Sequence, residues 1–345
     1  MDGLKELLFG LSRACCITGG GEASEIVLAE LARLGIPART DAMGSIIAQV
    51  CAPLPGKPHL LLDAHLDEIG FTVTSIDEAG FLHVDKTGGP DLRVLAGHEV
   101  TVCGREPILG VFCCKPPHLT TAEDYKQVPS LDESAVDIGL GHDDACRAVS
   151  LGDFVFLRRE PTLLEGGIVT GKALDNRAGV AAVLRTLSML EERHCGIGLT
   201  ALFPLAEETG ERGATTGAFA VAPDMAIVVD TSFALTPDAP AEKCGRLGQG
   251  PMIGIAPTLS GEVTRGLIDT AAGLHIPFQR EIMAGRTGTD ADVISVSRAG
   301  VRTGLVSVPL RYMHTANEAV ALEDVSGTAA LIAEFIRKTG GLANA

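Results

Sequence analysis

The pattern of apolar and polar residues changes twice along this chain of 345 residues. Before residue 69 and after about residue 165, apolar segments of strand length alternate with segments of helical periodicity. Between them, short apolar stretches are separated by Gly, Pro and Asp about every ten residues. The outer pattern is typical of a mostly parallel sheet sandwiched by helices, and the inner one of an all-β region. We therefore predict an α/β fold with an inserted small β-rich domain.

The same patterns predict the individual elements. The outer regions should contain helices at residues 2–14, 22–34, 177–192, 264–274, 291–299 and 322–339, and strands at 46–50, 59–62, 198–204, 226–229 and 304–308. The inner region should contain strands at 71–73, 81–84, 99–103, 108–112 and 153–157, and a polar surface loop at 118–134. The predicted domains are residues 1–68 together with 165–345, and residues 69–164.

Composition excludes several classes of partner. With 44 acidic and 28 basic residues, the formal net charge is -16, which repels phosphate backbones, so we expect no nucleic-acid partner. No apolar run approaches the roughly 20 residues that a bilayer requires, and the first ten residues do not resemble a signal peptide. The nine cysteines include no CxxC pair, and we interpret them as reduced and mostly buried. We expect a cytoplasmic protein without membrane association.

Five short segments end an apolar stretch with side chains of the kind that bind metal ions. Because the carboxyl ends of parallel strands meet at one edge of a sheet, these side chains could converge there. Two imidazoles and three carboxylates suit zinc, cobalt or manganese, whereas a structural zinc site would prefer thiolates. The candidate ligands are His65, Asp175, one of the adjacent pair Glu207 and Glu208, Asp230 and His314, with Asp67 beside His65.

Each candidate also has an ordinary structural explanation. For Glu207 and Glu208 the functional explanation is the stronger one, because adjacent carboxylates after a buried strand repel unless a cation binds one of them. None of the residues decides the question alone, but their occurrence together, each at a strand end, favours a metal site. The alternatives are a surface ion pair for His65 and Asp67, a helix cap for Asp175, an exposed loop for Glu207 and Glu208, a solvent-facing strand tip for Asp230, and a core histidine for His314.

Over essentially its whole length, the sequence resembles the glutamyl, or tetrahedral, aminopeptidase family, which also includes deblocking aminopeptidases. The pre-helix segment ACCITGGGEAS and the Arg286-Thr287 pair depart from the family's usual pattern, and both bear on specificity rather than on metal binding. The motifs that carry the resemblance are DAHLDEIGF, LAGHEVTVCG, GVFCCKPPH, GKALDNRAG, EETGERGA, VVDTS, GRTGTDAD and RYMHTANE.

The resemblance implies a zinc-peptidase-like catalytic domain that removes N-terminal residues from short peptides with two divalent metal ions, zinc or cobalt. It also implies that the inserted domain is barrel-like and serves dimerisation and assembly, with a tetrahedral dodecamer as the expected homo-oligomer. The implied roles are Asp175 bridging the metals, Glu208 and His314 on one metal, His65 and Asp230 on the other, Glu207 as general base, and Asp67 orienting His65.

Three alternative functions stay open at this point. One is a metal-dependent deacylase or carboxypeptidase, although the long insertion between His65 and Asp175 favours the aminopeptidases. The second is an endoglucanase-type glycosidase, a label that some relatives carry, but this function would leave both histidines unexplained. The third is a non-enzymatic assembly protein built on a peptidase fold.

Overall fold

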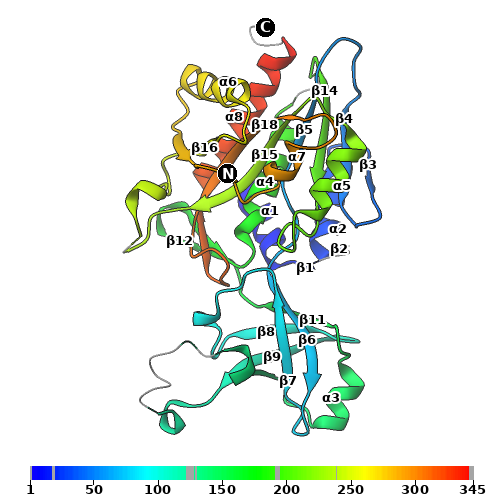
Figure 1. Cartoon of the computed structure of the whole chain (residues 1–345), viewed down its shortest axis with the longest axis vertical. Helices are drawn as coiled ribbons and strands as arrows, with labels where there is room; N and C mark the ends of the chain where they lie inside the picture. The colour runs from blue at the N-terminus through cyan, green and yellow to red at the C-terminus, as the bar shows by residue number, and fades with distance from the viewer. Residues whose placement is uncertain are drawn as a thin grey trace. The chain divides into compact units, whose positions relative to one another are not determined.

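A computed structural model describes the chain from residue 2 to residue 341, except residues 18–19, 122–127, 129, 191–194 and 238. The chain divides into two compact units, each with its own apolar core (Figure 1). Unit 1 comprises Met1–Asp67, Pro161–Met313 and Glu318–Ala345. Unit 2 comprises Glu68–Glu160 and His314–Asn317. Part of the predicted loop at 118–134 lies outside the described residues.

In the described part of unit 1, eleven strands form one sheet, with the order β12-β13-β19-β18-β15-β5-β14-β4-β3 and with β16 and β17 attached at β18. The central pairs β14–β5, β5–β15 and β15–β18 are parallel, as is β16–β17, whereas the other pairs are antiparallel. The sheet is therefore mixed and not mostly parallel, because short connections such as the one between β3 and β4 reverse the chain. The strands of the sheet are β3 Ala38–Thr40, β4 Ile46–Cys51, β5 His59–Asp63, β12 Thr162–Leu164, β13 Ile168–Gly171, β14 Gly198–Phe203, β15 Met225–Phe233, β16 Met252–Ile255, β17 Gln279–Ile282, β18 Arg302–Arg311 and β19 Glu318–Ala321.

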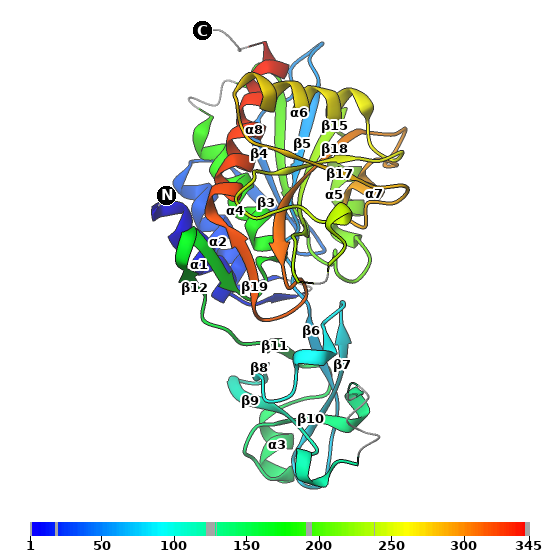
Figure 2. The ribbon, with the colours of Figure 1, turned by 90° about the vertical axis from the view of Figure 1, so that its left-hand side faces the viewer.

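Helices cover both faces of this sheet. Helices α1, α2, α4 and α8 share an apolar core with one face, and α5 and α7 share another with the opposite face. Figure 2 shows the two groups on opposite sides of the strands. A separate hairpin, β1 Cys16–Ile17 with β2 Gly20–Gly21, lies between α1 and α2 in sequence. The helices are α1 Asp2–Arg13, α2 Glu22–Arg33, α4 Leu174–Met189, α5 Arg212–Val221, α6 Gly261–Gly273, α7 Ala291–Ile294 and α8 Leu322–Gly340.

Unit 2 is a closed six-stranded barrel with the order β10-β7-β6-β11-β8-β9, closed by pairing of β9 with β10. Inside the barrel the rings of Phe71 and Phe112 pack edge to face, with their centroids 4.8 Å apart. The predicted α/β fold with an inserted β-rich barrel is confirmed. Its elements are β6 Gly70–Ile76, β7 Leu82–Thr87, β8 Glu99–Cys103, β9 Pro107–Cys114, β10 Ser134–Asp137, α3 His142–Ala148 and β11 Phe154–Leu157.

Two local predictions differ from the structure. The helix expected at 291–299 ends at Ile294, because Arg298 and Gly300 adopt positive φ angles of 53° and 100° that a right-handed helix does not allow. Helix α5 was not predicted, because its Ala, Thr and Gly residues give only a weak apolar periodicity. In the described part of the chain, no helix is long and apolar enough to cross a membrane.

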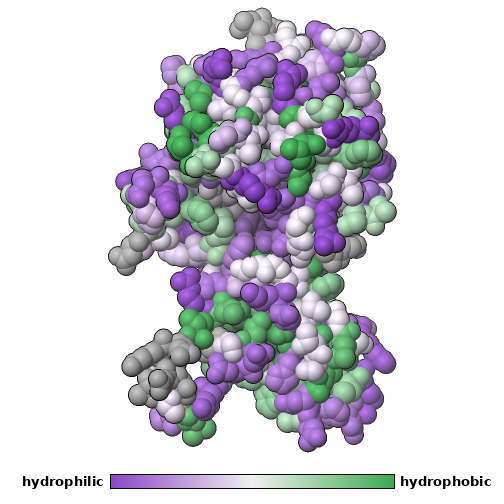
Figure 3. Space-filling model, in the orientation of Figure 1, coloured by the Kyte–Doolittle hydropathy of each residue, from purple (hydrophilic) through white to green (hydrophobic). Residues whose placement is uncertain are grey.

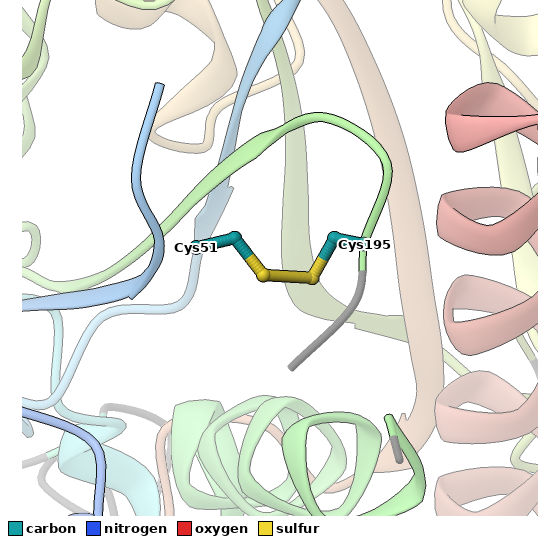
Figure 4. The surroundings of a disulfide bond; sticks show 2 residues. All are labelled: Cys51 and Cys195. Carbon is teal, nitrogen blue, oxygen red and sulfur yellow. A yellow bond between two sulfur atoms is a disulfide. The ribbon is translucent and has the colours of Figure 1, made fainter. Parts of the chain in front are cut away.

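One disulfide joins two segments of unit 1 that are far apart in sequence. Cys51 is the last residue of β4, and Cys195 lies shortly before β14 (Figure 4). Antiparallel pairing of β4 with β14 brings the two cysteines to a Cα–Cα distance of 6.5 Å. The interpretation of the cysteines as reduced is therefore wrong for this pair, whose proximity depends on strand pairing over 144 positions.

Candidate metal centre

The predicted site residues of unit 1 lie where the central strands of the sheet end. His65 follows β5 by two residues, Glu207 follows β14 by four, and Asp230 lies in the second half of β15. Because these three strands are parallel and adjacent, their carboxyl ends share one edge of the sheet (Figure 1). Asp175 belongs to the first turn of α4, which packs on β15.

A buried histidine and two buried aspartates form the centre of this group. The Nε2 atom of His65 is 3.5 Å from Oδ1 of Asp175 and 3.6 Å from Oδ1 of Asp230. One ligand atom from each residue lies within 4.8 Å of the others, and all three side chains are buried. One imidazole nitrogen facing two carboxylates could hold a divalent cation such as zinc or cobalt.

The electrostatics of the group depend on its burial. Burial alone would lower the pKa of His65, but the nearby carboxylates of Asp175, Asp230 and Asp67 outweigh it and raise this pKa well above its usual range. Burial also raises the pKa of Asp230, although His65 opposes the shift. Positive charge, either a proton on His65 or a metal cation, therefore stabilises the ionised form of these buried carboxyl groups.

Asp67 connects His65 to the segment that carries the two glutamates. One of its carboxylate oxygens lies 3.6 Å from Nδ1 of His65 and accepts the backbone N–H of Glu207 at 3.1 Å. The other oxygen accepts the backbone N–H of Glu208, also at 3.1 Å. Asp67 is 1% exposed, so these interactions are shielded from water. A carboxylate in this position orients the imidazole and fixes the glutamate segment relative to it.

Glu207 lies in a tight loop between β14 and α5. Its carbonyl accepts the backbone N–H groups of Gly210 and Glu211, and the preceding Ala206 has a positive φ of 64°. Burial raises the pKa of Glu207 to about 9, while the nearby charge of His65 opposes the shift and the neighbouring carboxylates add to it. In the chain alone this pKa keeps the carboxyl protonated at neutral pH, whereas a cation at the neighbouring cluster would lower the pKa towards neutrality, where a carboxyl group can accept and donate a proton.

The Asp175 segment is anchored to the sheet through its backbone and its neighbour. The backbone N–H of Asp175 donates to Oε2 of Glu318 at 3.0 Å, and Glu318 begins β19. The side-chain amide of Asn176 donates to the carbonyl of Val229, one residue before Asp230, at 2.8 Å. The Asp175–Asn176 peptide bond is cis. These contacts bring the Asp175 carboxylate to His65, so Asp175 is not a simple helix cap.

His314 belongs by its contacts to unit 2. Its Nδ1 atom lies 2.9 Å from the carbonyl oxygen of Gly89, and its own carbonyl accepts the backbone N–H of Asp91 at 3.0 Å. His314 has a positive φ of 63°. The contact with Gly89 orients the imidazole ring of His314 through Nδ1. The role of His314 as a metal ligand stays a prediction, as do the roles of the other candidate residues.

Asp63, Asp290 and Glu318 are among the buried acidic residues that received no individual role from the sequence. Asp63 ends β5, Asp290 precedes α7, and Glu318 holds the backbone of Asp175. Asp63 and Asp290 stand inside the motifs DAHLDEIGF and GRTGTDAD, which was the available signal. Their positions within largely apolar or Gly-rich stretches gave no hint that they would be buried together.

Metal-type ligands at the ends of parallel strands, with a protonatable glutamate beside them, are typical of hydrolases that use divalent metal ions. The fold and the site assign the chain to this class. Within it, the chain belongs to the family of M42 glutamyl aminopeptidases, whose profile matches residues 44–331. The predicted aminopeptidase function, hydrolysis of peptide bonds at the N-terminus, is thereby confirmed.

Individual relatives agree over nearly the full length. The chain is 32% identical to a putative aminopeptidase, SgcX, of Escherichia coli, over 94% of this chain and 90% of the relative. An aminopeptidase from the archaeon Desulfurococcus kamchatkensis has a similar structure, with a TM-score of 0.89, 28% identity and coverage of 100% and 99%. A Pyrococcus horikoshii TET1 peptidase that can assemble into a tetrahedron or an octahedral shell has a TM-score of 0.82, 28% identity and coverage of 96% and 98%.

Proposed function

We propose that this aminopeptidase removes N-terminal residues from short peptides with two divalent metal ions, zinc or cobalt. The observation that carries the proposal is the buried cluster of His65, Asp175 and Asp230, with Glu207 beside it. In this proposal His65 and Asp230 hold one ion, Glu208 and His314 hold the other, and Asp175 binds both.

In this proposal Glu207 moves the protons of the reaction. Divalent ions bound at such sites polarise a carbonyl group and lower the pKa of water. Glu207 accepts a proton from the attacking water and donates it to the leaving amine, which requires that cations at the neighbouring cluster lower the pKa of this buried carboxyl group. Asp67 holds Glu207 in place through its backbone N–H and keeps His65 in one orientation. These two residues therefore complete the proposed catalytic group.

The alternative functions have less support. The relatives named above are aminopeptidases, which favours free N-termini over the blocked peptides of a deacylase or the C-termini of a carboxypeptidase. A glycosidase needs two carboxyl groups about 5–9 Å apart on opposite sides of a sugar and no metal. In this chain the carboxylates instead share a histidine.

We further propose that residues 69–164 form the dimerisation and assembly domain, and that the protein forms a tetrahedral homo-oligomer of twelve chains, as the tetrahedral relatives do. Apolar side chains exposed on unit 2 support this: Leu109 is 53% exposed, Val111 40% and Leu151 65%. Figure 3 shows hydrophobic surface on this unit. We also propose a cytoplasmic location, where the Cys51–Cys195 disulfide would be unusual.

The test is hydrolysis of a panel of aminoacyl-p-nitroanilides by the purified protein. The enzyme is assayed as isolated, after a chelator, and after zinc, cobalt or manganese is restored. We expect release from free-amine substrates that the chelator abolishes and that one of the metals restores. N-acetylated versions of the same substrates serve as the control.

The outcome separates the candidates. Cleavage of the blocked substrates alone would contradict the aminopeptidase proposal in favour of a deacylase. Release that continues at full rate after complete removal of bound metal would contradict the two-metal proposal. The preferred N-terminal side chain would follow directly from the rates across the panel.

A further inference from the structure

Two buried carboxyl groups close to the cluster have no part in the proposed mechanism. Asp63 has no exposed surface, and Asp290 is 1% exposed. Among the described residues, no other group hydrogen-bonds to any of their four carboxyl oxygens, although the two carboxyl groups lie close enough to interact with each other. Buried carboxyl groups are normally satisfied by hydrogen bonds, and an unsatisfied one often marks a catalytic role or an ion. These two residues therefore require an explanation.

The strands place both carboxyl groups on the same side of the sheet as the cluster. Asp63 on β5 pairs laterally with Val228 on β15, and Asp230 follows Val228 by two residues. Side chains two residues apart on a strand share a face, so Asp63 and Asp230 point to the same side. Asp290 reaches that side because Ala291 and Ile294 of α7 pack in the same apolar cluster as Val228.

The two carboxyl groups interact with each other and with the site. Both carboxyl groups are buried, they lie close enough to interact with each other, and the charges of His65 and Asp230 are nearby. A negative charge on either buried carboxyl group is unfavourable in the chain without metal. A cation bound by His65, Asp175 and Asp230 would offset that cost.

We propose that Asp63 and Asp290 form an outer carboxylate pair that strengthens metal binding at His65, Asp175 and Asp230. Both are positioning residues, since they act on the metal through the field they add behind its ligands. Removing an outer partner of a metal site typically lowers metal affinity about 10- to 100-fold. The inference rests on the proposed metal site and extends it to residues behind the ligands.

The test measures metal binding rather than activity. Metal-free wild type and Asp290→Asn are dialysed against buffers with graded free Zn²⁺, and bound zinc per chain is measured by elemental analysis. We expect Asp290→Asn to need about 10- to 100-fold more free Zn²⁺ to fill at least one site. Asp324→Asn is the matched control, because Asp324 is also fully buried but accepts the N–H groups of Gly248 and Gly250 instead.

The possible results are distinct. Equal affinities in wild type and Asp290→Asn would overturn the inference, as would an equal loss in Asp324→Asn, which would indicate general destabilisation. Wild type that binds no zinc would overturn the metal site itself. If Asp290→Asn fails to fold, Asp63→Asn is measured in the same way, and the same loss of affinity is expected.

Discussion

Asp67 contacts both His65 and the backbone of Glu207 and Glu208. Replacing it with the isosteric amide Asn tests whether the carboxylate itself is needed. In Asp67→Asn, one of the backbone N–H groups of Glu207 and Glu208 faces an amide NH₂ instead of an acceptor. We expect metal affinity and kcat/KM to fall about 10- to 100-fold. The variant is measured by metal titration and steady-state kinetics.

Asp41 provides the matched control for that variant. Its carboxylate also accepts two backbone N–H groups, those of Met43 and Ser45, in a loop outside the cluster. Asp41→Asn should lower stability but leave metal affinity and kcat/KM unchanged. A similar loss of affinity in both variants would refute a specific role for Asp67.

Glu207 provides the sharpest test of the proposed proton transfer. Glu207→Gln keeps the shape of the side chain but cannot exchange a proton, so kcat should fall about 10²- to 10⁴-fold while bound metal stays unchanged. Glu211→Gln, four residues further on, should keep its activity. Normal turnover by Glu207→Gln with full metal content would remove Glu207 from the role of general base.

The sequence predicts His65, Asp175 and Asp230 because each follows an apolar stretch and because metal ligands at strand ends converge in an α/β fold. The structure brings these three together. The sequence alone could not predict the Asp63–Asp290 arrangement. A carboxylate at the end of a buried strand looks the same in sequence whether it contacts water, a cation or another carboxylate.

At the scale of elements, β4 and β14 are joined twice, by strand pairing and by the Cys51–Cys195 disulfide. A cross-link over 144 positions restricts the unfolded chain, which corresponds to about 3–5 kcal/mol of stability. Cys51→Ser, or reduction, should lower the free energy of unfolding by about that amount. Denaturant unfolding measures it, with Cys244→Ser as control, since Cys244 is not in a disulfide. An unchanged midpoint after reduction would contradict the prediction.

Helix α8 carries a pH-dependent contact at its start. Burial raises the pKa of Asp324 to about 6, although hydrogen bonds from Gly248 and Gly250 oppose the shift. The folded chain binds the proton of the Asp324 carboxyl group more tightly than the unfolded chain does. The contribution of Asp324 to stability should therefore be greatest below about pH 4 and should fall, by on the order of 2 kcal/mol, as the pH rises to about 6. In Asp324→Asn this part of the pH dependence should vanish. Urea unfolding of wild type and Asp324→Asn from pH 4.5 to 7 tests this prediction. If the free energies of unfolding of the two proteins change in parallel with pH, the prediction is contradicted.

Element prediction succeeded where one periodicity dominates, as in α1, α2 and α8. It failed where backbone geometry overrides composition, as at Arg298 and Gly300, whose positive φ angles end the helix that the apolar spacing extends. The antiparallel flanks of the sheet were also missed, because apolar runs do not carry strand direction.

At the scale of the whole molecule, the proposed assembly can be measured directly. Twelve chains of 35.8 kDa would give a particle of about 430 kDa. Replacing Leu109 and Val111 with Asp, on the outward face of β9, should lower this mass by weakening contacts between copies. Light scattering after size exclusion measures it, and Leu54→Asp, at an exposed position of unit 1, is the control. An unchanged mass in the β9 variant would exclude that face from the assembly.

The disulfide has one more consequence for the molecule as a physical object. The stretch of chain between Cys51 and Cys195 contains all of Glu68–Glu160, so most of unit 2 lies within a covalently closed ring. A single cut anywhere in that ring opens it but releases no fragment. A nicked chain would run as one band on a gel without reductant and as two with it, and damage to the barrel would stay hidden until the disulfide is broken.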